Sequence, residues 1–152
     1  MTEELMLDAK YAFAQGDFKK CVEVFDKILE KEPENQVALF TRGSAKFRDE
    51  DYQGAIDDFT DYISKNPTNE KVFCSRGNAY LALNKNDEAM ADFDRSLELN
   101  PQYPTAYLSR SELFLRLNEK EQAEQDQTVG EQLQRQIAQA YYETQGVMFQ
   151  NF

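Results

Sequence analysis

The chain has 152 residues with 41% hydrophobic and 30% charged side chains, a composition that indicates one folded domain, and its formal net charge of −11 argues against nucleic acid and membrane surfaces as partners. It has no histidine and only two cysteines, Cys21 and Cys74, which disfavours zinc, a disulfide framework and histidine-based catalysis. No secretion signal and no apolar run long enough to cross a bilayer is present, so we expect a cytoplasmic protein with reduced thiols.

Apolar residues recur three and four positions apart along most of the chain, which is the spacing of one helical face. This pattern predicts helices, in chain order, over about 2–15, 18–31, 35–48, 52–65, 69–83, 86–99 and 104–117, and a last one from about 119 to about 144. Asp17 and Asp51 are expected to cap the helices that follow them. The turns carry Gly16, Asn84 and Asn118 at positions that favour a left-handed backbone, whereas Glu50 at the equivalent place is unexplained.

A period of 34 residues organises these helices into pairs. The clearest marks of the period are prolines after every second helix, small residues in the first helix and aromatic residues in the second, at Pro33, Pro67, Pro101, Ala9, Gly43, Gly77, Ser111, Phe25, Phe59 and Phe93. Small residues let two helices approach closely, and the aromatic rings fill the space beside them. Each pair buries its apolar surface only by stacking on the next pair, so the sequence predicts a solenoid.

The stretch Arg76-Gly-Asn-Ala-Tyr, followed by Asp87-Glu-Ala-Met-Ala-Asp-Phe and closed by Pro101, resembles the tetratricopeptide repeat (TPR). The resemblance implies an all-α fold, a right-handed α-solenoid of stacked helix-turn-helix repeats with a C-terminal capping helix. It divides a single domain, 1–152, into repeats at about 2–34, 35–68, 69–102 and, in part, 103–127, with the capping helix and tail over about 128–152. It also implies a module that binds another protein.

The pattern changes after the first helix of the fourth unit. Gln127 stands where the aromatic residue is expected and Arg135 where the proline is expected. Leu133, Ile137, Ala140 and Tyr141 continue as an apolar stripe at helical spacing, with Gly130 as a possible break. We expect this segment to cover the last open face of the solenoid.

Arginine and aspartate appear together or not at all in a unit. Units two to four contain the pairs Arg42 and Asp58, Arg76 and Asp92, and Arg110 and Asp126, whereas the first unit has Asp8 and Val24 in these places. This joint occurrence predicts a structural ion pair between the two helices of one unit, and pairing between neighbouring units is an alternative.

Motifs for catalysis, cofactors and metals are missing. The segment that begins Asp49-Glu50-Asp51 resembles the start of a calcium loop, but Thr60 stands where that loop needs a bidentate glutamate. No phosphate-binding loop, dinucleotide fingerprint or nucleophile motif occurs. We therefore expect neither an enzyme nor a metal or cofactor site.

The resemblance implies that first-helix side chains line a concave groove that receives a peptide of a partner protein. Carried over residue by residue, the groove positions are Met6, Lys10, Phe13, Val37, Phe40, Ser44, Phe47, Arg48, Lys71, Cys74, Asn78, Leu81, Thr105, Leu108, Glu112 and Leu115. An apolar groove with a polar rim is typical of an interaction surface. The alternative is that the chain's own C-terminal segment covers it.

Two further interpretations concern the occupant of the groove. Some relatives hold the C-terminal carboxylate of chaperone tails with Lys and Asn side chains, but the matching positions here are Met6, Lys10, Thr41, Lys71 and Ser75, of which only Lys71 fits. A chaperone-tail ligand is therefore not expected. The apolar tail with Val147, Met148, Phe149 and Phe152 suggests instead self-assembly, in which the tail of one copy docks on a neighbour and forms a homo-oligomer.

Overall fold

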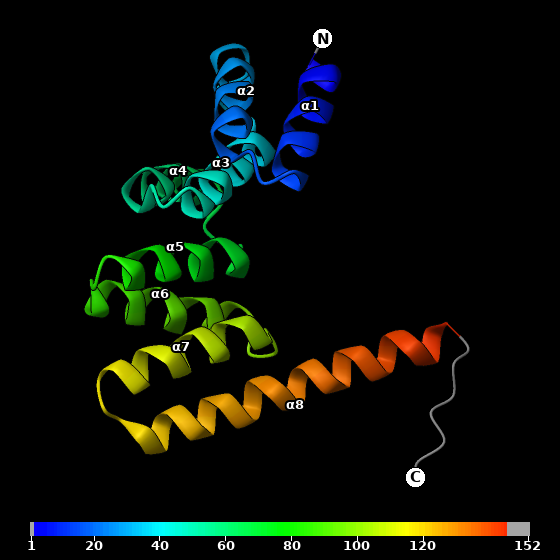
Figure 1. The fold of residues 1–152 in the computed structure, drawn as a ribbon. Coiled ribbons are helices and arrows are strands. Elements are labelled where there is room, and N and C mark those ends of the chain that lie inside the picture. Colours follow the sequence, from blue (N-terminus) through cyan, green and yellow to red (C-terminus); the bar gives the residue numbers. More distant parts are fainter. Residues whose placement is uncertain (1, 146–152) are drawn as a thin grey trace.

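The computed structural model describes residues 2–145, and in this range the chain forms helices joined by short turns, with no strands. Their order is α1 (Thr2–Ala14), α2 (Phe18–Lys31), α3 (Gln36–Arg48), α4 (Tyr52–Lys65), α5 (Glu70–Ala82), α6 (Asn86–Leu99), α7 (Pro104–Arg116) and α8 (Lys120–Thr144). Figure 1 shows successive helix pairs stacked one on the next from the N-terminal pair to α7 and α8. The predicted all-helical solenoid is confirmed, with helix ends within one or two residues of those expected.

Side-chain caps begin several of the helices. Asp17 accepts a hydrogen bond from the backbone N–H of Lys20, and Asp51 accepts one from that of Gly54, as expected. Asn35 caps α3 in the same way. These caps satisfy backbone donors that have no partner inside a helix, and they fix where each helix begins.

The turns inside the helix pairs share one backbone conformation. Gly16, Glu50, Asn84 and Asn118 all have positive φ, at 76°, 65°, 57° and 61°. The turn geometry therefore imposes a left-handed residue at this position in every unit. Glu50 adopts it although its side chain makes it unfavourable, which leaves local strain in the second unit.

In each of the two middle units, a glycine in the first helix allows the second helix to approach closely. A Cβ built on Gly43 would lie 2.7 Å from Cε1 of Phe59, and one built on Gly77 would lie 2.7 Å from Cε1 of Phe93. Both phenyl rings are fully buried. The ring of the second helix thus packs directly on the backbone of the first, as the alternation of small and aromatic residues predicts.

The fourth unit departs from this packing. Ser111 replaces the glycine and donates a hydrogen bond from its hydroxyl to the carbonyl of Ala123, and Gln127 replaces the phenyl ring. A hollow of about 430 Å³ opens there, lined by Ser111, Leu115, Ala123, Glu124, Gln127 and Thr128. The hollow lies where Gln127 stands in place of the phenyl ring of the other units.

Helix α8 is nearly twice as long as the other helices, and it runs without a break through Gly130. Gly130 lies inside this helix and packs under the side chain of Leu108, where a Cβ would lie 2.7 Å from Cδ2. Only Ala123, Asp126 and Gly130 of α8 are buried. The apolar stripe expected to cover the end of the solenoid lies beyond them and is mostly exposed. The capping contact comes from the first half of α8 instead.

Candidate functional site

The first helix of the third unit, α5, contacts the first helix of the fourth unit, α7. The thiol of Cys74 on α5 lies 3.9 Å from the hydroxyl oxygen of Ser109 on α7. Arg116 of α7 donates a hydrogen bond to the carbonyl of Leu81 on α5. Residues of α1, α3 and α5 together line one cavity of about 250 Å³. The face built by α1, α3, α5 and α7 is the surface that we call the first-helix groove.

The cavity in this groove brings together five of the predicted binding residues, Phe13, Ser44, Phe47, Arg48 and Asn78. Its other lining residues are Ser75 and Phe59. Phe59 is fully buried, so it forms an apolar floor, while the hydroxyls and the amide offer hydrogen bonds at the rim. An apolar floor with a few polar groups around it suits one side chain of a bound peptide.

Contacts from the second helices hold the aromatic walls of the cavity. Phe13 makes an edge-to-face contact with Phe18 at 5.4 Å between ring centroids, and Phe47 makes one with Tyr52 at 5.3 Å. The guanidinium of Arg48 lies 5.6 Å from the centroid of the Phe18 ring. Rings fixed from behind lose little freedom when a ligand binds, so these walls are preorganised.

Two predicted groove residues are core residues instead. Cys74 is 1% exposed and Leu81 is 3% exposed, and both belong to the apolar core of α5–α7. Both positions are covered in the core of α5–α7, where Ser109 and Arg116 of α7 contact Cys74 and the carbonyl of Leu81. Burial raises the pKa of the Cys74 thiol to about 11. Neither side chain can contact a ligand in this structure.

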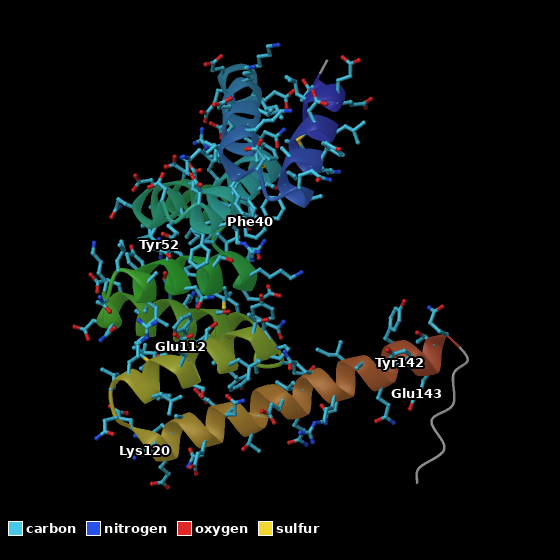
Figure 2. The ribbon with its side chains drawn as sticks, in the orientation of Figure 1. Phe40, Tyr52, Glu112, Lys120, Tyr142 and Glu143 are labelled. Carbon is cyan, nitrogen blue, oxygen red and sulfur yellow. The ribbon has the colours of Figure 1, made fainter. Side chains whose placement is uncertain are left out.

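Three more predicted residues are half-buried. Phe40 packs against Phe59 and Tyr62, with ring centroids 5.9 Å and 6.2 Å apart, so its removal would disturb the core as well as the groove. Met6 packs on the same core, and Leu108 lies under Gly130. The remaining predicted residues are exposed but line no part of the cavity: Lys10, Val37, Lys71, Thr105, Glu112 and Leu115. Figure 2 labels Phe40 on α3 and Glu112 on α7.

Ser75 lines the cavity, although it matches only a chaperone-tail position and is not among the predicted groove residues. It precedes Asn78 by three residues, so both side chains share one face of α5. That spacing is the signal that could have identified it. The tail residues Val147, Met148, Phe149 and Phe152 lie outside the described residues.

The arginine–aspartate series joins helices both within and between units. Arg42 donates two hydrogen bonds to Asp58, through Nε at 2.9 Å and Nη2 at 2.6 Å, and a third, through Nη1, to Asp26 of the preceding unit at 2.8 Å. Arg110 does the same with Asp126 and Asp94. The pairing within a unit and the pairing between units therefore coexist.

The middle arginine differs in one contact. Arg76 donates two hydrogen bonds to Asp92, both at 2.8 Å, but its Nη1 donates at 3.2 Å to the neutral hydroxyl of Thr60. Its guanidinium also lies 5.7 Å from the ring centroids of Phe73 and Tyr80. The hydrogen bond to Asp92 raises the pKa of Arg76 further above its ordinary value. These contacts give the arginines a structural role.

The described part of the chain shows neither a membrane-spanning helix nor a metal-binding cluster. No helix within residues 2–145 combines the length and the apolar character that a bilayer span requires. Over the same residues, no three cysteine, aspartate or glutamate side chains are grouped so that they could hold a metal ion.

Several solved structures share this fold. A MamA structure from Desulfovibrio magneticus RS-1 superposes with a TM-score of 0.82 at 19% identity, covering 90% of this chain and 77% of that one. A tetratricopeptide repeat protein from Parabacteroides merdae gives 0.72 at 26% identity, covering 82% and 50%. The first TPR of Spaghetti (RPAP3), bound to the HSP90 peptide SRMEEVD, gives 0.66 at 28% identity, covering 82% and 90%.

Comparison with sequence families agrees with the structures. No curated protein matches the chain. Two family models, both described as tetratricopeptide repeat, match residues 7–70 and 70–103. Together they span the first three helix pairs, in which the 34-residue period is complete. The chain therefore belongs to the tetratricopeptide-repeat family.

Proposed function

We propose that this chain is a non-catalytic interaction module that binds a peptide segment of a partner protein in the first-helix groove. Repeats of this family in general mediate protein–protein interactions. The observation that supports the groove as the binding surface is the cavity of about 250 Å³ shared by α1, α3 and α5. Phe13 and Phe47 form its walls, so an apolar side chain of the peptide is the expected anchor.

Charge favours a peptide that also contains a carboxylate. Among the sixteen predicted groove residues, Lys10, Arg48 and Lys71 are basic and only Glu112 is acidic, a balance of +2 on a chain of net charge −11. Arg48 lines the cavity itself. An acidic group beside the apolar anchor would therefore meet an oppositely charged rim, which speeds association and fixes orientation.

The related complex of Spaghetti (RPAP3) with the peptide SRMEEVD shows that a chain of this fold can receive an acidic peptide. The binding mode proposed here differs from chaperone-tail binding. Of the positions that hold the tail carboxylate in some relatives, only Lys71 has a suitable side chain here, and the cavity lies beside Arg48 instead. We therefore place the anchor between Phe13 and Phe47. The tail of a neighbouring copy is a second candidate occupant, supported by its apolar sequence alone.

Peptide selection tests the proposal directly. Random peptides of roughly a dozen residues, displayed on phage, would be selected on the wild-type chain, and selected peptides would be synthesised and titrated. The expected peptides contain an apolar residue close to an Asp or Glu. Ser44→Trp, which fills the cavity, is expected to weaken their binding at least about tenfold, a loss of about 1.4 kcal/mol.

Ser64→Trp is the matched control, because Ser64 is an exposed serine on α4 outside the cavity. It should bind the peptides as the wild type does. Arg48→Ala should lower affinity for the acidic peptides but not for versions with the acid changed to its amide. Equal binding by Ser44→Trp and wild type, with unchanged helical circular dichroism, would exclude this groove.

A further inference from the structure

The second half of α8, residues 131–144, contains no buried residue and is mostly exposed, with Glu131 and Leu133 at its start partly covered. Helix α7 begins at Pro104, whose carbonyl oxygen would lie 3.3 Å from a Cβ on Gly130, so the start of α7 packs on α8 at that point. Beyond it, Ile137 is 55% exposed and Tyr141 is 61% exposed. Figure 1 shows this part of α8 extending well past the solenoid.

The exposed stripe continues the face that already packs against a helix. Ala123, Asp126 and Gly130 are the buried residues of α8, and they are spaced by three and four. The same spacing of three and four residues continues through Leu133, Ile137, Ala140 and Thr144. A stripe with this spacing is the contact seam of two helices that pack side by side. The surface is therefore shaped to receive another helix along the line of α7.

An isolated helix of this length has little stability of its own. No residue of 131–144 is buried, and helices shorter than about 12–15 residues are marginal in water. Packing against a partner helix would supply the missing stabilisation.

Charge makes a second copy of the chain an acceptable partner. Residues 131–144 contain Glu131, Glu143 and Arg135, a net charge of −1, whereas the whole chain has −11. The remaining polar side chains of the segment are mostly glutamines. Two copies that meet through this segment would bring together helical surfaces that each contribute only one net negative charge. The acidic solenoids would lie at opposite ends, where salt screens their repulsion over about 10 Å.

We propose that two copies of the chain dimerise through the second half of α8, with the two helices antiparallel. Antiparallel packing reproduces the direction in which α7 packs on the first half of α8, and it allows two-fold symmetry. The Ile137 side chains of the two copies meet near the two-fold axis, and Leu133 of each copy packs against Tyr141 of the other. The stripe on each helix then covers the stripe on the other.

The size of the contact sets its strength. Residues 131–144 span about 21 Å of helix, which is roughly four turns. A helix pair of this length buries less surface than the roughly 800 Å² per partner of a standard interface. The dimer is therefore weak, dissociates on dilution into the micromolar range, and becomes stronger when salt screens the acidic solenoids.

Sedimentation velocity on the full chain, from about 5 µM to about 500 µM, tests the proposal in low and in physiological salt. We expect a monomer at the dilute end and a dimer at the concentrated end. Ile137→Glu should remain monomeric throughout. Gln132→Glu adds the same charge on the opposite face of α8 and should dimerise as the wild type does. A full chain that is monomeric at every concentration overturns the proposal, as does a dimer that survives Ile137→Glu.

Cross-linking tests the geometry, because Cys21 and Cys74 are buried and should not interfere. Oxidation of Ile137→Cys should join two copies through the introduced thiols, and Gln132→Cys should not be joined. A chain truncated after Thr144 separates this contact from one made by the tail. The truncated chain still dimerises if α8 is the interface, whereas loss of the dimer would assign the contact to the tail and contradict the proposal.

Discussion

Arg76 on α5 and Asp92 on α6 form a two-bonded ion pair in which both donor–acceptor distances are 2.8 Å. Asp92 is buried, and the aromatic rings of Phe73 and Tyr80 flank the guanidinium. The pair fixes the spacing of the two helices in the third unit. It is equivalent to the pairs in the second and fourth units, so one geometry is used three times.

Removing one partner of this pair should be costly. Asp92→Ala leaves the guanidinium of Arg76 without its main acceptor in a largely buried place, so we expect a loss of about 3–5 kcal/mol in the free energy of unfolding. Urea denaturation followed by circular dichroism measures it. Glu98→Ala breaks the exposed pair with Arg95 and serves as the control, with a change below about 1 kcal/mol. Equal losses in the two variants would contradict the structural role of the buried pair.

Glu50→Gly should stabilise the chain. Glu50 holds a φ of 65° in the turn between α3 and α4, a conformation that glycine adopts without steric cost. We expect a gain of about 0.5–1 kcal/mol in thermal or urea unfolding. Asn84→Gly is the matched control in the next unit. Because asparagine tolerates the left-handed region, its change should be smaller.

Gly77→Ala should destabilise the third unit. The new methyl group would lie 2.7 Å from a ring carbon of Phe93, and that ring is fully buried. We expect a loss of about 1–3 kcal/mol. Combining the substitution with Phe93→Leu removes the collision, so the double variant should lose less than the sum of the two single losses. Additive losses would show that the Phe93 ring does not determine how closely α5 and α6 approach each other.

The Cys74 thiol should be protected from alkylation in the folded chain. Burial raises its pKa to about 11, whereas an exposed cysteine has a pKa near 8.5. At about pH 8 the native thiol should therefore react with iodoacetamide far more slowly than the urea-unfolded thiol, as read by peptide mass spectrometry. Rapid labelling of the native chain would place Cys74 at the surface.

The same shift predicts a dependence of stability on pH. Because the folded pKa is raised, the unfolded thiol loses its proton first as pH rises. The stabilisation is complete below about pH 8.5 and is lost as pH rises toward about 11. Cys74→Ala should show a flatter decline of melting temperature over this range than the wild type.

The sequence predicted the repeats because the same local geometry recurs every 34 residues. A left-handed turn, an N-cap and a glycine beside a ring each demand particular residue types, so their recurrence marked the helices and their pairing. Even Glu50 could be assigned to its turn from its place in the period, although its own residue type argued against it.

The groove was less predictable. Helical spacing shows which side of α5 faces inward, but it does not separate residues buried between neighbouring first helices from residues that face the cavity. Cys74 and Leu81 belong to the first class and Asn78 to the second, although all three lie on one side of α5. The stripe on α8 gave a similar difficulty, because an apolar pattern indicates that something packs there without saying which element does so.

The neutral contact between Arg76 and Thr60 has a consequence for how the chain unfolds. The other two arginines reach the preceding unit through a charged acceptor, so the boundary between the second and third units lacks an ion pair of this kind. The buried residues divide near the same place, into a cluster over α1–α4 with Val72 and Ala79, and another over α5–α7. In a linear array, cooperativity passes only through neighbouring units. Hydrogen exchange should therefore detect a partly unfolded intermediate whose border lies between α4 and α5.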